Sequence, residues 1–122
     1  MKLTYQTGIA GEIIAENWLQ EQHGMRSLER RFRTKAGEID LIMQDGDTLV
    51  FVEVKTRMNA SPGTGLLAVD RRKQKRLANA ARLYLILKGY NRCECRFDVI
   101  EVSKDDILYI PNAFQPGGLF YN

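Results

Sequence analysis

The chain has 122 residues, of which 27% are charged and 44% hydrophobic, and its formal net charge is +3. This length supports a single folded domain over residues 1–122, the composition is that of an ordinary globular protein, and one histidine with two cysteines cannot supply a Cys/His zinc site. Because the sequence has no long apolar run and no signal-peptide pattern, we expect a cytoplasmic protein with no membrane partner.

Residues 5–22 are predicted to form the first helix, with Thr4 or Thr7 as its N-cap and Gly24 as its stop. Glu12 lies near the edge of the apolar face of this helix, where a glutamate is more often solvated than functional. From spacing alone, an orientation of Glu12 toward the sheet stays the less favoured alternative.

Residues 25–33 are predicted to form the first strand, with Leu28, Arg30 and Phe32 on one face. This strand and the connection after it contain the first of two cation clusters: Arg30, Arg31, Arg33 and Lys35. Clustered cations suit a polyanionic partner, but the solvated face of an ordinary element is an equally good interpretation of either cluster taken alone.

Residues 37–55 are predicted to form a tight hairpin. Its first strand alternates, with two sets of three residues on opposite faces: Ile39, Leu41 and Met43 on one, and Glu38, Asp40 and Ile42 on the other. Residues 44–47 have the composition of a turn. Residues 48–54 are apolar on both faces, as in a strand buried on both sides, yet Glu53 and Lys55 share one face of this strand.

An even-numbered hairpin loop makes the numbers of opposite residues sum to 93, so that Asp40 faces Glu53. Glu38 then faces Lys55. A three-residue loop without a bulge would turn Asp40 to the other face, since a one-residue slip inverts every side chain. We predict the even loop, which gathers three carboxylates and one ammonium in one patch. A buried carboxylate there must be paired, bound to a metal or near water.

Residues 58–65 are predicted to form a surface flap beside this patch, and residues 67–88 the second helix, with Asp70 and Gly89 as its caps. The first two turns of this helix contain the second cation cluster: Arg71, Arg72, Lys73, Lys75 and Arg76. Cations at a helix N-terminus oppose the helix macrodipole, which indicates that they serve an outside partner such as phosphate.

Residues 94–102 and 107–110 are predicted to form the last two strands, followed by a tail at 110–122 that docks in part on the domain. Asp98 lies in the first of these strands, where a structural partner such as Arg96 is favoured over a functional role. The predicted order is therefore α-β-β-β-α-β-β, a mixed sheet of the α/β class flanked by helices. The strand after the second helix should return parallel to the third strand.

Asp40 and Glu53, with the carbonyl of Val54, offer the hard oxygen ligands that Mg²⁺ or Mn²⁺ prefers. A metal ion bound there would polarise a phosphoryl group and lower the pKa of a bound water. Lys55 would stay charged beside the carboxylates and stabilise the negative charge that develops on the phosphate. The alternative is a purely structural interstrand ion pair with Lys55, because so short a motif also arises by chance.

Several longer segments carry more specific information: GxxGExxA at 8–15, LERRFR at 28–33, GEIDLI at 37–42, LVFVEVKTR at 49–57, RFDVI at 96–100 and NAF at 112–114. Together they resemble the YraN-like family of small bacterial proteins, which are predicted endonucleases of the restriction-endonuclease-like, PD-(D/E)xK fold. Two departures are visible. Ile39 replaces the Pro that precedes Asp in the broader nuclease pattern, and Arg31 stands where we expect Asn.

The resemblance implies metal-dependent cleavage of phosphodiester bonds by a restriction-endonuclease-like mixed sheet. It assigns metal and catalytic roles to Asp40, Glu53 and Lys55. It makes Glu12 the helix carboxylate that completes the site, and Gln74 the polar residue of the second helix. We expect DNA rather than RNA as the partner, bound by these cations: Arg57, Arg71, Arg72, Lys73, Lys75, Arg76, Arg33 and Lys35.

The expected substrates include branched or single-stranded DNA, as for small resolvases of similar fold. One site cuts one strand, so cleavage of a symmetric junction would require a homodimer. The alternative is a nucleic-acid-binding module that retains the fold, does not cut and recruits a partner. The intact Asp40, Glu53 and Lys55 argue against this alternative.

Overall fold

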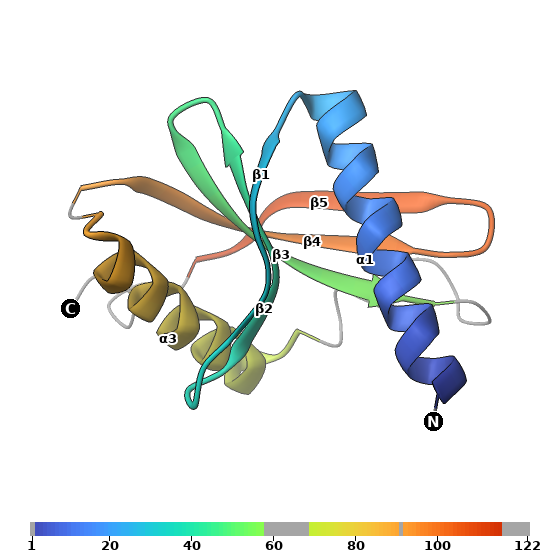
Figure 1. Ribbon diagram of the computed structural model, residues 1–122, viewed down its shortest axis with the longest axis horizontal. Helices are drawn as coiled ribbons and strands as arrows, with labels where there is room; N and C mark the ends of the chain where they lie inside the picture. The colour runs from blue at the N-terminus through green and yellow to red at the C-terminus, as the bar shows by residue number, and fades with distance from the viewer. Residues whose placement is uncertain (1, 58–68, 91, 116–122) are drawn as a thin grey trace.

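The computed structural model describes residues 2–57, 69–90 and 92–115, with side chains from residue 8 onward. Its elements follow the predicted order: α1 (Lys2–His23), β1 (Arg26–Arg33), β2 (Glu38–Asp45), β3 (Thr48–Thr56), α3 (Arg71–Lys88), β4 (Glu94–Val102) and β5 (Ile107–Phe114). The strands form one five-stranded sheet in the order β1-β2-β3-β4-β5. Helices α1 and α3 cover opposite faces of this mixed sheet (Figure 1), which confirms the predicted fold class.

The β2–β3 hairpin has the predicted even loop. Only Gly46 and Asp47 separate the two strands, and the φ of +61° at Gly46 suits a tight two-residue turn. The numbers of opposite residues sum to 93, so that Leu41 faces Val52 and Met43 faces Val50. This antiparallel register ends at Leu41, and Asp40 is therefore the first residue of β2 beyond the paired part of the hairpin.

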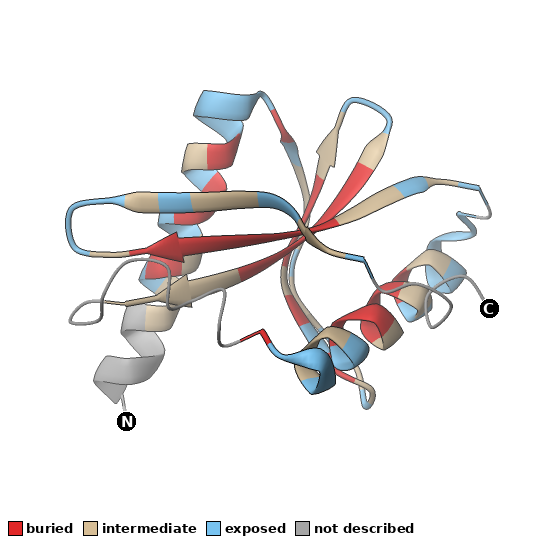
Figure 2. Ribbon diagram, turned by 180° about the vertical axis from the view of Figure 1, so that it is seen from behind, coloured by how far each residue is buried: buried red, intermediate tan, exposed pale blue. Residues whose placement is uncertain are grey.

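The central strand β3 is buried on both sides, as its sequence predicts. Leu49 and Phe51 belong to the core cluster under α3, whereas Val50 and Val52 belong to the cluster under α1. After α3 the chain returns as β4, parallel to β3 along its whole length. Figure 2 shows the buried residues concentrated in these central strands and on the inward sides of the helices. None of the described helices is long and apolar enough to cross a membrane.

Both helices begin at other residues than predicted: α3 begins at Arg71, so Val69 and Asp70 of the predicted span 67–88 precede it. Helix α1 begins at Lys2, so Thr4 and Thr7 lie inside it and the predicted N-cap is wrong. Threonine lowers helix propensity only slightly, and a local preference of this size does not decide where a packed helix starts. Gly24 ends α1 in the left-handed conformation, as expected. The caps of α3 are also as predicted: the Asp70 carboxylate accepts a hydrogen bond from the Lys73 amide at 2.9 Å, and Gly89 has a φ of +71°.

The predicted alternation of β1 and β2 is wrong at two residues. Arg30 does not share the face of Leu28 and Phe32, which pack on the α3 side, because its guanidinium binds a glutamate of α1. Likewise, Ile39 lies in the α3-side cluster, whereas Leu41, two residues on, lies in the α1-side cluster.

A backbone irregularity explains both differences. The β1–β2 register shifts between Ser27 and Glu29. Arg31 and Asp40 are skipped between the pairs Arg30–Leu41 and Phe32–Ile39, and Arg31 has a φ of +52°, a conformation uncommon for any residue but glycine. Strict alternation holds only along an unbroken ladder, and here it is broken next to Asp40.

Strand β5 runs to Phe114, four residues further than predicted, and Phe114 stacks on Phe97 of β4 at 5.0 Å between ring centroids. The strand therefore includes Pro111, which an edge strand tolerates because one side of it needs no ladder donor. The predicted flap at 58–65 and the end of the tail, 116–122, lie outside the described residues.

Two glycines allow close approach of the helices to the sheet next to Asp40 and Lys55. A Cβ atom on Gly11 of α1 would collide with the Thr56 hydroxyl at the end of β3. A Cβ atom on Gly37, just before β2, would lie 2.5 Å from the carbonyl oxygen of Arg76 in α3. Backbone can retreat from such a clash only by moving the helix, so Gly37 sets the distance between α3 and the start of β2.

We expect Gly37→Ala to lower the free energy of unfolding by about 1–3 kcal/mol, because the new methyl group overpacks this contact. Gly8→Ala is the matched control, since nothing lies within 4 Å of a Cβ atom there. In helix α1 it should raise stability by about 0.5–1 kcal/mol. Urea unfolding of both variants measures the two effects, and equal shifts would contradict the assigned role of Gly37.

Candidate active site

Asp40 lies where β2 separates from β3. Its Oδ2 atom accepts a hydrogen bond of 2.8 Å from the backbone N–H of Val54. This contact joins the two strands beyond the last paired residues, Leu41 and Val52, and it holds the carboxylate beside the next residue of β3, Glu53. The structure therefore brings Asp40 and Glu53 together, as the even hairpin loop predicts.

Glu53 is buried, with 3% of its surface exposed. Two ammonium groups approach the same carboxylate oxygen, Oε2: Lys55 Nζ from the same strand at 3.2 Å, and Lys73 Nζ from the start of α3 at 3.2 Å. A buried carboxylate is tolerated only when it is paired in this way. Lys55 thus contacts Glu53 of its own strand. The predicted position of Glu38 opposite Lys55 is wrong, because Glu38 pairs with Arg33 at 3.5 Å.

The surroundings of Asp40 favour the protonated form of its carboxyl group. Burial raises the pKa of Asp40 to about 8, with the negative charge of Glu53 as the second cause of the rise, while the hydrogen bond from Val54 acts in the opposite direction. The charge of Glu12 contributes a smaller rise. A pair of carboxylates in this state gains stability from a proton or a cation placed between them.

The donor atoms fit a divalent metal such as Mg²⁺ or Mn²⁺. Asp40 and Glu53 offer hard carboxylate oxygens, and the Val54 carbonyl points to the same edge of β3 as its N–H, toward Asp40. Among the described residues no group of three acidic, histidine or cysteine side chains is close enough to hold a metal ion. The protein would therefore supply two carboxylates and a carbonyl, which suits Mg²⁺ because that ion keeps several waters.

Glu12 extends toward this site from α1 but is bound to an arginine. Its Oε1 atom accepts a hydrogen bond of 2.9 Å from Arg31 Nε. Glu12 is near enough for its charge to act on Asp40, yet its oxygens are turned to β1. The helix carboxylate expected from the family resemblance is therefore present, and the unexpected Arg31 is what holds it.

In the structure Lys73, rather than Gln74, reaches the candidate active site. The Gln74 side chain donates a hydrogen bond of 3.1 Å to the Val69 carbonyl, just before α3, whereas Lys73 contacts Glu53. Neighbouring helix residues differ by about 100° in direction, so only one of the two can face the sheet squarely, and a cation run does not indicate which one.

The other predicted cations lie around this end of the sheet. Arg71, Arg72, Lys75 and Arg76 lie on the first turns of α3. Arg33 and Lys35 are exposed at the end of β1 and in the connection to β2, which touches α3 through Gly37 and Arg76. Arg57 follows β3 and its amide donates to the Val102 carbonyl. They border the side of the domain that contains Asp40 and Glu53.

Asp98 is fully buried and has the structural role that the sequence favours. Its oxygens accept hydrogen bonds from Arg96 Nε at 3.2 Å and from the Asn112 amide at 2.8 Å. The Tyr109 hydroxyl donates to the same carboxylate. This network ties β4 to β5 and is separate from the residues around Asp40.

Sequence reasoning missed Arg31 and undervalued Lys73 as site residues. Both belong to cation clusters, in which spacing alone cannot tell a functional cation from a solvated one. The only early signal was the departure from the family pattern at Arg31.

Comparison with known proteins identifies the family of this sequence. A model of the uncharacterised protein family UPF0102 matches residues 11–102. A UPF0102 protein of Klebsiella pneumoniae is 43% identical over 93% of this chain and 89% of its own length. The YraN protein of Escherichia fergusonii is 41% identical over 92% of this chain and 86% of its own. The crystal structure of SSO0001 is similar with a TM-score of 0.42 and 15% identity, covering 93% of this chain and 55% of that chain.

We expect Asp40→Asn to become progressively more stable than the wild type as the pH rises. Because the pKa of Asp40 is raised to about 8 in the folded protein, the folded state keeps a proton that the unfolded chain releases above about pH 4. The stability of the wild type therefore falls toward about pH 8, whereas the amide has no proton to lose. Unfolding in urea at about pH 5 and pH 8 should show the difference growing by about 1–3 kcal/mol.

Asp47→Asn, in the exposed turn of the same hairpin, is the matched control and should show no such growth. A constant difference between Asp40→Asn and the wild type over this interval would mean that Asp40 ionises freely and that the carboxylates are not coupled.

Proposed function

The chain belongs to the uncharacterised protein family UPF0102, and from this premise we propose that it is a divalent-metal-dependent endonuclease that hydrolyses phosphodiester bonds in DNA. The observation that carries the proposal is the placement of two carboxylates and two ammonium groups around one point at the end of the hairpin. A structural ion pair would need one lysine for Glu53. The second lysine and the second carboxylate, Asp40, are what a phosphodiester site requires.

Each residue has a distinct part in the proposed reaction. Asp40 and Glu53, with the Val54 carbonyl, would hold Mg²⁺ or Mn²⁺. When bound, such an ion polarises the phosphoryl group and lowers the pKa of its water. Lys55 is held by Glu53 at 3.2 Å, and from this position its ammonium would orient an attacking water. Lys73 contacts the same oxygen and would neutralise charge that develops on the phosphate.

The cations near this end of the sheet support a polyanionic substrate. Four of them, Arg71, Arg72, Lys75 and Arg76, lie on the first turns of α3, within reach of the backbone of a strand that enters the site. We propose branched or single-stranded DNA as the substrate class. Cutting both strands of a symmetric junction would require a twofold dimer, because each chain contributes one such site.

Two observations favour a second function, a nucleic-acid-binding module that does not cut. Arg31 holds Glu12 at 2.9 Å, and the described residues contain no three-acid cluster. If two carboxylates and a carbonyl do not retain the ion, the domain would bind DNA through its cations and recruit a partner for the chemistry.

We expect purified protein with magnesium or manganese to cleave labelled single-stranded, duplex or four-way-junction DNA, and a chelator to abolish the products. Glu53→Gln and Lys55→Met should each reduce the rate by about a hundredfold or more, because they remove a metal ligand and a charge used in the transition state. Asp47→Asn is the control that keeps full activity. Gel analysis of products over time measures the rates.

Tight binding of all three substrates with no metal-dependent product would establish the module instead. Products that persist in both Glu53→Gln and Lys55→Met would assign the cleavage to a contaminant or to another site and end the proposal.

We expect the double variant Arg72→Ala, Arg76→Ala to bind duplex DNA with a weaker dependence on salt. The two residues lie one turn apart on the exposed side of α3. Each phosphate that the protein no longer neutralises should reduce the slope of log affinity against log salt concentration by about 0.9. Lys88→Ala, at the far end of the same helix, should leave the slope unchanged. An unchanged slope in the double variant would show that this end of α3 does not contact DNA.

A further inference from the structure

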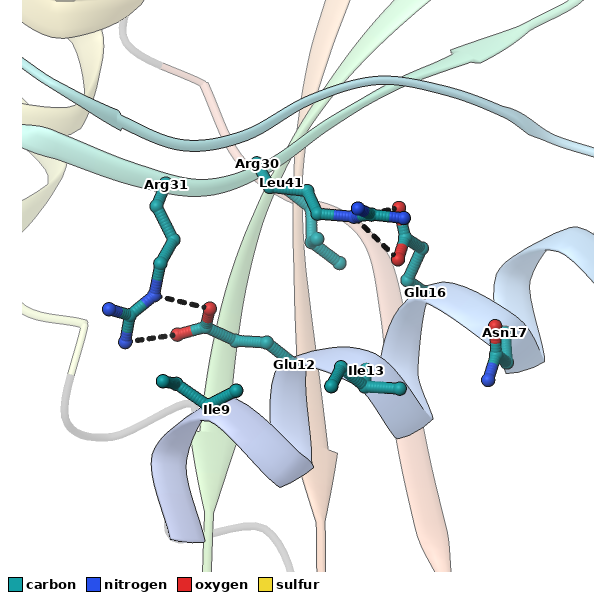
Figure 3. A pocket seen from close by; sticks show the side chains of 8 residues that line it. All are labelled: Ile9, Glu12, Ile13, Glu16, Asn17, Arg30, Arg31 and Leu41. Atoms are coloured by element: carbon teal, nitrogen blue, oxygen red, sulfur yellow. Dashed lines mark hydrogen bonds and ion pairs between the residues drawn. The ribbon is translucent and has the colours of Figure 1, made fainter. Parts of the chain in front are cut away.

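A hollow lies between α1 and the sheet. It encloses about 360 Å³, within the range of about 300–1,000 Å³ that is typical of sites for small organic groups. Ile9 and Ile13 of α1 and Leu41 of β2 form its apolar walls. Figure 3 shows two ion pairs that bridge from the helix to β1 beside these apolar side chains: Glu12 with Arg31, and Glu16 with Arg30.

This hollow lies next to the candidate active site, because Glu12 belongs to its lining and is near enough to Asp40 for its charge to act there. Leu41 is the residue after Asp40, and Arg31 lies between Arg30 and Phe32, whose partners Leu41 and Ile39 flank Asp40. Glu12 follows Gly11, which touches Thr56 directly after Lys55 on β3. A group seated in the hollow is therefore close enough to belong to the same nucleic-acid strand as a phosphate held between Asp40 and Lys55.

The charges of the hollow select against a phosphate. Each arginine there is matched by a carboxylate, at 2.9 Å in both pairs, so no unbalanced positive charge is left for an anion. The lining combines apolar side chains, two guanidinium groups whose charges are already paired, and the amide of Asn17. These features suit a neutral, planar group with hydrogen-bonding edges, which is the chemistry of a nucleobase.

We propose that this hollow binds one unpaired nucleobase of the strand whose phosphate enters the active site. This inference rests on the proposed function, and it narrows the substrate to nucleic acid with an unstacked base, as in single strands or branch points. The exposure of Ile13, 49% of its surface, is consistent with a wall that a base would cover. A base paired within a duplex could not enter without leaving its stack.

The test compares two strands of the same length and charge, in a chelator so that nothing is cut. One is oligothymidine, and the other has the same sugar-phosphate backbone without bases. We expect the wild type to bind oligothymidine about tenfold more tightly, a difference in the range found for a stacked base. An oligouridine arm shows whether RNA supplies the base equally well. Fluorescence anisotropy at fixed salt measures the three affinities.

Ile13→Trp, which fills the hollow, should reduce this ratio to about one while the affinity for the abasic strand stays unchanged. The matched control is Ile14→Trp. Ile14 is similarly exposed, at 44%, but lines a different hollow beside Trp18 and Val102, and its ratio should remain that of the wild type. If Ile13→Trp does not fold, Asn17→Trp at the rim serves the same purpose.

The experiments distinguish failure of the proposed pocket from failure of the proposed nuclease activity. Equal affinity of the wild type for both strands, or a ratio that survives a folded Ile13→Trp, overturns the pocket even if the protein cuts DNA. A tenfold ratio that Ile13→Trp removes, in a protein that yields no metal-dependent product, supports the pocket and leaves only the nuclease overturned.

Discussion

The hydrogen bond from the Val54 amide to the Asp40 carboxylate is the contact on which the geometry of the site depends. It forms where the paired part of the hairpin ends, so the two strands can part without leaving this donor unsatisfied. The same bond fixes Asp40 against Glu53 and places two acidic groups side by side. The contacts of the neighbouring residues follow from that placement.

The first of these contacts is made by two lysines. Lys55 and Lys73 both reach Glu53, so the buried glutamate is balanced while Asp40 is left with a raised pKa. The second contact involves α1: Arg31 of β1 holds Glu12 of α1 away from the other two acids. Arg31 does so from a left-handed backbone conformation, which costs free energy in a non-glycine residue. This arginine therefore links the candidate active site to the apolar hollow beside it.

Much of the fold was predictable because it depends on local patterns. The order of elements, the two-residue turn at Gly46-Asp47 and the parallel return of β4 all follow from periodicity, turn chemistry and the handedness of crossover connections. The predictions failed where a pattern is interrupted. Arg30 changes faces because the β1–β2 register shifts between Ser27 and Glu29. Ile39 does so because the ladder is interrupted beside Asp40, and no sequence period records such irregularities.

The sequence by itself determined that Asp40, Glu53 and Lys55 share one patch, because the parity of a short hairpin loop decides which residues are opposite. Only the tertiary structure decided which cation of α3 meets Glu53, and that Glu12 binds Arg31 rather than the other acids. Those contacts join residues from separate elements. Their partners depend on helix rotation and on close approaches at Gly11 and Gly37, which are properties of packing and not of spacing along the chain.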